Sequence, residues 1–218
     1  SEVALLMVNR SISKQTLLRL PLYLNYLKQF GENQPEHISA TTISEALRLN
    51  HVVVRKDLAS VSTAGKPKIG YKTADLIAEL EAFLGYNDVD DAIIVGAGKL
   101  GKALLTYKGF RDCGMNIVAA FDIDEELYDD DYGGKRILPM DKLMDLCERM
   151  RVRIGIITVP AENAQAICNL LIESGILAIW NFAPVHLEVP DGVLVHNENL
   201  AASLALLSKQ LREGFEAR

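Results

Sequence analysis

The sequence predicts an α/β protein of two modules, an N-terminal winged helix-turn-helix and a C-terminal Rossmann domain with a doubly wound parallel sheet. Three observations support this prediction. Residues 13–85 carry apolar side chains mostly at helical spacing. Residues 92–101 read AIIVGAGKLG, an apolar strand that runs into a glycine-rich turn. Beyond this turn, apolar strands alternate with amphipathic helices, as is typical of a parallel sheet.

The predicted boundaries follow from these patterns. The predicted segments are a loosely ordered tail over residues 1–12, the winged helix over 13–85, the Rossmann domain over 89–199 and a C-terminal dimerisation helix over 200–218. The chain has 218 residues and is 49% hydrophobic, which suits one or two soluble domains with a core. Residues 1–10 lack the basic start of a signal peptide, and no apolar stretch approaches the roughly 18–20 residues of a membrane span. We therefore expect a cytoplasmic protein without membrane contact.

The net charge of −6 is unevenly distributed. Residues 1–80 hold ten Lys/Arg and seven Asp/Glu, a net of +3, whereas residues 81–218 hold thirteen and twenty-two, a net of −9. A basic front on an acidic body fits contact with a polyanion. The three cysteines form no C-x-x-C pair, which favours reduced thiols over a redox switch. The four histidines show no metal-ligand spacing, so we expect no metal site.

Polar residues mark the starts of the helices in the front module. Ser13 is expected to cap a helix that runs to about residue 30, where Gly31 ends it. Thr42 and Glu45 have the spacing of a capping box at the start of a short helix. Asn50 is expected to cap the next helix.

This next helix has an apolar face and a basic face. Val54, Leu58 and Val61 lie at i, i+4 and i+7. Two short helices joined by a tight turn, with a basic outer face on the second, predict a helix-turn-helix. The alternative is a small helical bundle with a solvated basic face. The predicted DNA contacts on this helix are His51, Arg55 and Lys56.

Residues 63–71 read TAGKPKIGY, with the turn residues of a hairpin and two lysines near its tip. A basic hairpin after a recognition helix is a wing, placed to contact phosphates or the minor groove. The hairpin therefore favours the helix-turn-helix and adds Lys66 and Lys68 to the predicted DNA contacts. A closing helix from Thr73 and a linker over residues 85–88 complete the module.

The glycine-rich turn has the spacing of a dinucleotide site. Gly96 allows the turn, Gly98 lets the backbone approach a pyrophosphate, and Gly101 lets the helix pack close to the strand. The free N–H groups at the helix start then face the phosphates. The predicted contacts here are Gly96, Ala97, Gly98, Lys99, Leu100 and Gly101.

A buried strand over residues 117–121 ends in Asp122, about twenty residues after the last glycine of the turn. A carboxylate there accepts hydrogen bonds from the adenosine ribose and repels a 2′-phosphate, which favours NAD or NADH over NADP. The alternative is a Rossmann fold whose site has degenerated.

Two further strands, over residues 153–159 and 178–182, flank a helix over 161–174. Ligands of open parallel sheets lie at the carboxyl ends of the strands. We therefore expect the nicotinamide half of the dinucleotide at Thr158, Val159, Pro160, Asn181, Phe182, Ala183 and Pro184.

A short strand near residues 193–195 and a last helix over 200–211 finish the chain. This helix carries an apolar stripe of Leu200, Leu204, Leu207 and Leu211. The stripe belongs either to the core of its own chain or to a subunit contact. Because the predicted sheet is already complete, we favour the subunit contact.

Several short segments resemble the Rex family of bacterial redox-sensing repressors, and the similarity covers nearly all of residues 14–211. The segments are RLPLY at 19–23, VRKDL at 54–58, GK at 65–66 with GY at 70–71, VGAGKLG at 95–101 with Tyr107 and Gly109-Phe110, AAFD at 119–122 and NFAPV at 181–185. The resemblance implies a homodimer whose C-terminal helix inserts between the domains of the partner. It implies binding to a palindromic operator and release by NADH but not by NAD, with Tyr107 beside the nicotinamide ring.

The chain departs from the family pattern in two short stretches and at two single positions. Residues 59–62 and 67–68 replace the usual Ser-Tyr-Phe-Gly and the Arg-Gly of the wing. Asn25 and Asn199 stand where an Arg and an Asp would form a charge pair. Because both partners are neutral amides here, we expect a compensated contact.

Three functions compete. They are a repressor that responds to the NADH/NAD ratio, an NAD-dependent oxidoreductase, and a DNA-binding protein with a repurposed nucleotide site. No substrate domain follows the Rossmann pattern, and Thr158, Asn181 and Tyr107 do not readily act as a base near pH 7. We therefore expect no catalytic residue and favour the repressor.

Overall fold

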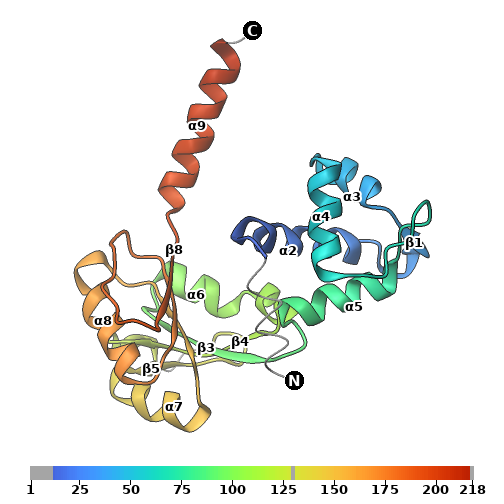
Figure 1. Ribbon diagram of the computed structural model, residues 1–218. Helices are drawn as coiled ribbons and strands as arrows, with labels where there is room; N and C mark the ends of the chain where they lie inside the picture. Colours follow the sequence, from blue (N-terminus) through green and yellow to red (C-terminus); the bar gives the residue numbers. More distant parts are fainter. Residues whose placement is uncertain (1–11, 129–130, 217–218) are drawn as a thin grey trace. The chain divides into compact units, whose positions relative to one another are not determined.

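The computed structural model describes residues 12–128 and 131–216. The chain divides into two compact units that join between Asp88 and Val89 (Figure 1). The predicted tail falls on residues 1–11 except for its last residue, and these lie outside the described residues. So do residues 217–218 of the predicted C-terminal helix.

The first unit is a helical domain with a small antiparallel sheet. Its elements are α2 (Lys14–Lys28), η1 (Gly31–Asn33), β1 (His37–Ile38), α3 (Ala40–Leu47), α4 (His51–Val61), β2 (Tyr71–Lys72) and α5 (Thr73–Leu84). Strand β1 pairs antiparallel with β2, and a bridge between Lys66 and Gly70 closes the hairpin before β2. This arrangement confirms the predicted winged helix-turn-helix. Strand β1 was not predicted, because two residues are too few to show a periodic pattern.

Short polar side chains fix where two of these helices begin. Ser13 Oγ accepts a hydrogen bond from the backbone N–H of Thr16 at 3.1 Å, at the start of α2. Asn50 Oδ1 accepts from the N–H of Val52 at 2.8 Å, at the start of α4. Both caps were predicted. Helix α2 ends at Lys28, ahead of the glycine predicted to stop it.

The predicted capping box at Thr42 and Glu45 is wrong, because α3 begins earlier, at Ala40. The N-cap is Ser39, whose Oγ accepts from the backbone N–H of Thr42 at 3.0 Å. Strand β1 ends just before Ser39 and delivers it in the extended conformation that a cap requires. Thr42 is therefore in the first turn of the helix.

The core of the first unit holds the three longer helices together. Fully or almost fully buried side chains come from each of them: Leu20, Tyr23, Leu24 and Leu27 of α2, Val54 and Leu58 of α4, and Leu76 and Leu80 of α5. Each buried leucine contributes about 1.5–3 kcal/mol of transfer free energy. This packing turns one face of α4 inward and leaves its basic face exposed.

The second unit is a six-stranded parallel sheet in the order β5-β4-β3-β6-β7-β8. Its elements are β3 (Asp90–Val95), α6 (Lys99–Thr106), η2 (Lys108–Cys113), β4 (Met115–Asp122), η3 (Glu125–Leu127), β5 (Ile137–Pro139), η4 (Met140–Lys142), α7 (Leu143–Met150), β6 (Ile154–Ile157), α8 (Ala161–Glu173), β7 (Ala178–Asn181), β8 (Leu194–Asn197) and α9 (Leu200–Glu216). All neighbouring strands pair in parallel. The sheet confirms the predicted Rossmann domain. Its strand order reverses between β3 and β6, the place where ligands bind in such sheets.

Apolar cores lie on the two faces of this sheet. Helices α7 and α8 cover one face with side chains that include Cys147 and Cys168, and Leu105 of α6 packs on the other. Burial raises the pKa of the Cys147 thiol to about 11 and also raises that of Cys168. These two thiols are therefore core residues and poor nucleophiles. Cys113 is exposed.

The sequence patterns did not identify β5 and α7. Strand β5 has three residues and ends in Pro139, so it shows no alternation. Helix α7 has eight residues and no side-chain cap at its start. Short elements without caps carry little local signal, and the sheet edge and the core position them instead.

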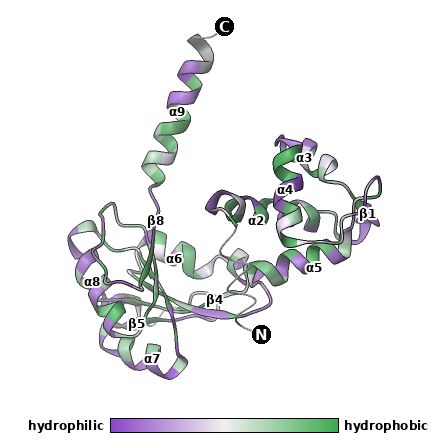
Figure 2. Cartoon of the chain, viewed as in Figure 1, coloured by the Kyte–Doolittle hydropathy of each residue, from purple (hydrophilic) through white to green (hydrophobic). Residues whose placement is uncertain are grey.

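The leucine stripe of α9 is exposed within the single chain. Leu200, Leu204, Leu207 and Leu211 each expose 60–68% of their surface, and Figure 2 shows the hydrophobic bands along α9. The stripe therefore adds nothing to the described core, and the intrachain alternative is wrong. Among the described helices, none has the length and apolar composition needed to cross a membrane.

Candidate functional site

Three glycines between the end of β3 and the first turn of α6 differ in what a side chain there would meet. Gly96 has a φ of +99°, a conformation that other residues rarely adopt, and a Cβ there would lie 2.9 Å from the backbone of Thr158. A Cβ on Gly101 would overlap the carbonyl oxygen of Gly96. A Cβ on Gly98 would meet no atom within 4 Å. Gly98 therefore borders open space, where a ligand has room to approach the backbone.

A cavity of about 630 Å³ lies beside this loop, at the carboxyl ends of β3, β4 and β6. It brings together six of the predicted contacts: Gly96, Gly98, Asp122, Thr158, Val159 and Pro160. Helix α6 starts at this cavity without a side-chain cap, so its first N–H groups are available to an anion. Ala97 is buried behind the loop, and Lys99 and Leu100 lie exposed on the first turn of α6, outside the cavity lining.

Asp122 is the one ionisable side chain among the described residues that line this cavity. Its carboxylate accepts from the backbone N–H of Ala97 at 2.5 Å, and from those of Ile123 and Asp124 at 2.7 and 3.1 Å. The contact with Ala97 joins the end of β4 to the glycine-rich loop. The cavity therefore carries one acidic group at the end of β4, beside the glycine-rich loop.

Thr158 positions the loop from the neighbouring strand. Its Oγ1 donates to the carbonyl oxygen of Gly96 at 2.6 Å and lies within donating distance of that of Val95 at 3.2 Å. Because Thr158 follows β6 directly, its hydrogen bonds connect the end of β6 to the end of β3, where the strand order of the sheet reverses. Its role in the described structure is to hold the loop in shape.

Two of the four residues predicted at the end of β7 lie at a second, smaller cavity. Ala183 and Pro184 line a space of about 290 Å³ together with residues at the end of β8. Asn181 is fully buried, and its Nδ2 donates to the carbonyl oxygens of Ala183 and Val185 at 3.2 and 3.0 Å. Asn181 therefore shapes the segment after β7 from inside. Phe182 is partly buried and packs against the core on the face of the sheet that Leu105 also covers.

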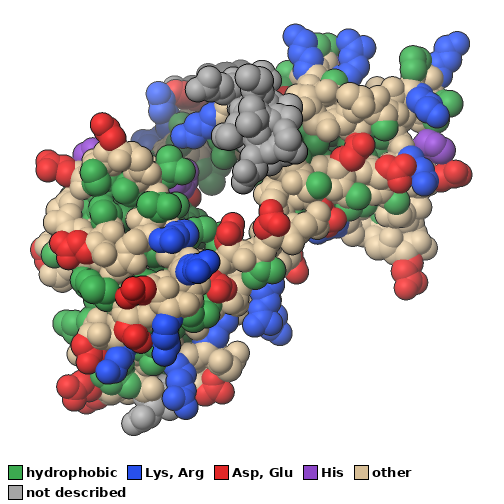
Figure 3. All heavy atoms as spheres, turned by 60° about the horizontal axis from the view of Figure 1, so that its bottom comes forward, with side chains coloured by type: hydrophobic (Ala, Val, Ile, Leu, Met, Phe, Trp, Pro, Cys, Tyr) green, Lys and Arg blue, Asp and Glu red, His purple; other side chains and the backbone are tan. Residues whose placement is uncertain are grey.

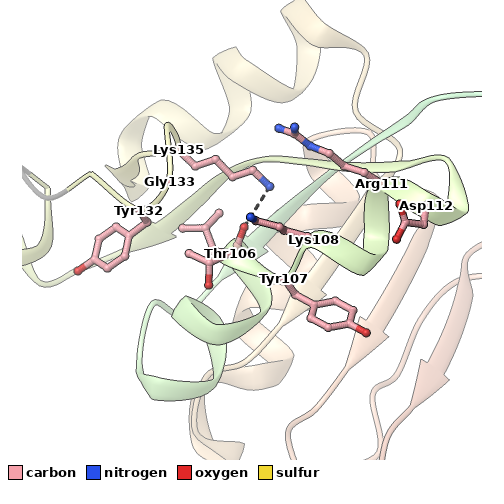
Figure 4. A pocket seen from close by; sticks show the side chains of 9 residues that line it. Thr106, Tyr107, Lys108, Arg111, Asp112, Tyr132, Gly133 and Lys135 are labelled. Carbon is pink, nitrogen blue, oxygen red and sulfur yellow. Dashed lines mark hydrogen bonds between the residues drawn. The ribbon is translucent and has the colours of Figure 1, made fainter.

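Tyr107 lines neither of these cavities but a third pocket, which Figure 4 shows from close by. It is 59% exposed and lines this pocket, of about 490 Å³, with Lys108, Arg111 and Lys135. Burial and, secondarily, the charge of Arg111 lower the pKa of Lys135, whose Nζ donates to the carbonyl oxygen of Leu105 at 3.0 Å. In the single chain, Tyr107 thus lies outside the lining of the glycine-rich loop's cavity.

The predicted DNA contacts are exposed on the first unit. Arg55 of α4 and the wing residues Lys66 and Lys68 line one groove, of about 490 Å³. His51 lies in a separate hollow at the start of α4, and Lys56 is exposed outside both. Lysine and arginine side chains gather at the upper right of Figure 3, over this unit. The structure thus groups a cation of the helix with two cations of the wing.

A buried carboxylate beside these cations escaped the sequence analysis. Asp57 of α4 accepts from Arg19 Nε at 2.7 Å, from Tyr23 Oη at 2.7 Å and from Thr16 Oγ1 at 3.0 Å. Burial alone would raise the pKa of Asp57, but the hydrogen bonds from these three residues lower it below its ordinary value. Burial and the bond to Asp57 raise the pKa of Tyr23 to about 12.

One signal of this cluster is present in the sequence. Thr16, Arg19 and Tyr23 stand at i, i+3 and i+7 and so share one face of a helix. Three polar donors on the face that also carries core leucines indicate a buried acceptor. The identity of that acceptor depends on which helix packs against this face.

Comparison with known proteins agrees with both units. A family model described as putative DNA-binding protein N-terminus matches residues 11–59, and one described as CoA binding domain matches residues 87–185. The redox-sensing transcriptional repressor Rex of Porphyromonas gingivalis is 37% identical over 206 residues, which cover 94% of either chain. That of Treponema denticola is 41% identical over 189 residues, 87% of this chain and 90% of the relative.

Solved structures show the same likeness. A crystal structure of RSP in complex with β-NAD⁺ and operator DNA superposes with a TM-score of 0.86 at 33% identity, covering 93% of this chain and 94% of RSP. RSP in complex with β-NADH gives a TM-score of 0.83 at 33% identity over 94% and 96% of the two chains. With relatives of this identity over nearly the whole length and both units present, the chain belongs to the Rex family of redox-sensing transcriptional repressors.

Proposed function

We propose that this protein binds a palindromic operator as a homodimer and that NADH releases it, so that it represses according to the NADH/NAD ratio in the cytoplasm. One observation carries the proposal. The same chain holds an acid-bearing dinucleotide cavity at Gly98 and Asp122 and a cationic groove between a recognition helix and a wing. The relatives with solved structures bind NAD⁺, NADH and operator DNA.

The cationic groove supports DNA binding. Arg55 on α4 has the fork of donors that reads a guanine edge in the major groove. Lys66 and Lys68 on the wing are placed for phosphates or the minor groove. Together these three cations span a helix and a hairpin, as a winged helix requires on a duplex.

Helix α9 supports the homodimer. A palindromic operator has two half-sites and needs two reading heads at a fixed spacing. The stripe of four exposed leucines on α9 is an apolar surface that a second copy of the chain can cover.

The chemistry of the cofactor supports release by NADH. NAD⁺ carries a positive charge on its nicotinamide ring and NADH does not. The segments predicted to face the ring include the apolar residues Val159, Phe182, Ala183 and Pro184, among which desolvating a cation is costly. A hundredfold preference for NADH would correspond to roughly 2.7 kcal/mol, enough to shift a DNA-binding equilibrium.

The lining of the 630 Å³ cavity beside the glycine-rich loop argues against an enzyme. Asp122 is the one described ionisable group in that lining, and three backbone N–H groups hold its carboxylate at the end of β4, on the side expected to take the ribose. A hydride-transfer enzyme needs a group that exchanges a proton with its substrate. We therefore propose that the dinucleotide acts as a signal and undergoes no reaction.

The test is a titration of operator binding. Fluorescence anisotropy of a labelled palindromic operator gives the dissociation constant without cofactor, with NADH, with NAD⁺ and with NADPH. We expect NADH to weaken binding, excess NAD⁺ to oppose NADH, and NADPH to act much more weakly because of Asp122. Operator binding that saturating NADH leaves unchanged contradicts the proposal.

A further inference from the structure

Glu198 is held at the edge of the sheet by two side chains. The indole N–H of Trp180 in β7 donates to Glu198 Oε1 at 3.3 Å, and Nε2 of His196 in β8 lies 3.1 Å from the same oxygen. Trp180 and His196 are paired across the two strands, so they approach the carboxylate from one face of the sheet. The backbone N–H of Glu198 also donates to the carbonyl oxygen of Asn181 at 2.8 Å.

Helix α9 begins directly after this anchor. Asn199 follows Glu198, and its Oδ1 accepts from the backbone N–H of Ala202 at 2.8 Å. Asn199 is thus the N-cap of α9, whose first residue is Leu200. Because one peptide bond separates anchor and cap, the position of the Glu198 side chain constrains the first turn of α9.

Glu198 and Asn199 also form part of the wall of the smaller cavity. This space of about 290 Å³ has Ala183 and Pro184 on the side of β7, and Glu198 and Asn199 on the side of α9. A group that fills the space would therefore contact both the segment after β7 and the anchor of α9.

Trp180 also belongs to a row of aromatic rings. Its ring contacts Phe182 at a centroid distance of 4.6 Å and Phe110 at 6.0 Å, and Phe110 contacts Tyr107 at 5.0 Å. The contacts of Phe110 with Trp180 and with Tyr107 are edge-to-face, a geometry that contributes about 0.5–1.5 kcal/mol each beyond burial, whereas the Trp180–Phe182 pair is tilted. The row joins Trp180 to the segment after β7 and to the end of α6.

We propose that Trp180 and Glu198 are positioning residues that transmit occupancy of this cavity to the first turn of α9. The hydrogen bond between them fixes the cap in one arrangement, and a ligand that displaces the segment after β7 moves Trp180 and so loosens the bond. A ligand shifts an equilibrium only through contacts that differ between the two states, and this bond is such a contact. The proposal rests on the proposed function, since NADH is the ligand and operator binding the response.

Two substitutions separate this role from folding. Trp180→Phe keeps an aromatic ring between Phe110 and Phe182 but removes the N–H donor. Glu198→Ala removes the acceptor. The matched control is Glu148→Gln on α7, an exposed carboxylate for which the described residues show no ion pair. Circular dichroism and a thermal melt establish that each variant folds.

The measured quantity is the ratio of operator dissociation constants with saturating NADH and without it. We expect Trp180→Phe and Glu198→Ala to lower this ratio by about fivefold or more, within the usual range of coupling between sites. Trp180→Phe keeps its affinity for operator in the absence of cofactor. Glu148→Gln keeps the ratio of the natural protein. A purely structural role would change operator affinity with and without NADH alike and leave the ratio unchanged.

The fluorescence of Trp180 gives an independent check, because it is the single tryptophan of the chain. Its emission maximum should shift in cofactor-free Glu198→Ala and stay in place in Glu148→Gln. Unchanged emission in Glu198→Ala, or full NADH response in both positioning variants, overturns the inference and leaves the proposed function standing. A natural protein that NADH does not release from the operator overturns both.

Discussion

Arg19 and Asp57 form a two-bond ion pair that joins α2 to the recognition helix. Arg19 Nε and Nη2 donate to the two carboxylate oxygens of Asp57 at 2.7 and 2.9 Å. Only 4% of the Asp57 side chain is exposed, against 24% of Arg19. Because Asp57 lies in the same helix as Arg55 and Lys56, this pair sets the orientation of the cations that face DNA.

Replacing Asp57 by Asn should therefore destabilise the first unit. The change leaves Arg19 as an uncompensated cation, and removing one partner of a buried pair costs about 3–5 kcal/mol. Urea unfolding followed by circular dichroism measures the loss. The control is Asp75→Asn, which removes an ion pair to Lys72 that is more than half exposed and should cost less than about 1 kcal/mol. Equal stability of the two variants would show that the buried pair contributes nothing special.

Stability should fall at both ends of the pH range for identifiable reasons. The folded pKa of Asp57 is lowered, so its stabilisation is present above the unfolded value and is lost on acidification below about pH 4. The folded pKa of Tyr23 is raised to about 12, so its stabilisation is present below the unfolded value of about 10 and is lost between these values. Unfolding midpoints across pH should lose their acid dependence most in Asp57→Asn and their alkaline dependence most in Tyr23→Phe.

The wing carries a lysine in a strained conformation. Lys68 has a φ of +65°, in the left-handed region that favours glycine. Lys68→Gly should therefore stabilise the wing by up to about 1 kcal/mol, while Lys68→Ala keeps the strain. Both remove one charge and should reduce the slope of operator affinity against salt by about one unit. Anisotropy at several salt concentrations tests this, and an unchanged slope in both variants places Lys68 away from the phosphates.

Two glycines of one loop should respond differently to substitution. Gly98→Val adds a side chain in open space, so the protein should fold normally but lose NADH binding. Gly101→Ala places a methyl group against the carbonyl of Gly96, so it should also lower the melting temperature. Melting curves and NADH fluorescence titration compare the two variants. NADH binding retained by Gly98→Val would show that no pyrophosphate lies against this backbone.

Removing residues 200–218 should abolish the dimer and tight operator binding. The described side chains of α9 are exposed, so their loss uncovers none of the described core and the truncated chain should still fold. Sedimentation velocity measures the oligomeric state. Charged substitutions at Leu204 and Leu211 on the intact chain should give the same result, and a dimer that survives them would assign the subunit contact to another surface.

The sequence by itself determined the features that depend on neighbours along the chain. The caps at Ser13 and Asn50 and the turn at Gly96 were predictable, because each reflects the backbone needs of a few consecutive residues. The same locality explains the error at Thr42. Ser39 offers an equally good cap one turn earlier, and strand β1, which fixes that choice, pairs with β2 far along the sequence.

Only the tertiary structure decided which distant groups meet. Arg55 lines one groove with Lys66 and Lys68. Asp57 accepts hydrogen bonds from Arg19, and Trp180 donates one to Glu198 just before α9. Each side chain is an ordinary polar or aromatic residue in the sequence, and its partner stands on another element. Helix packing and strand order, which arise from burying apolar surface across the whole unit, set these distances.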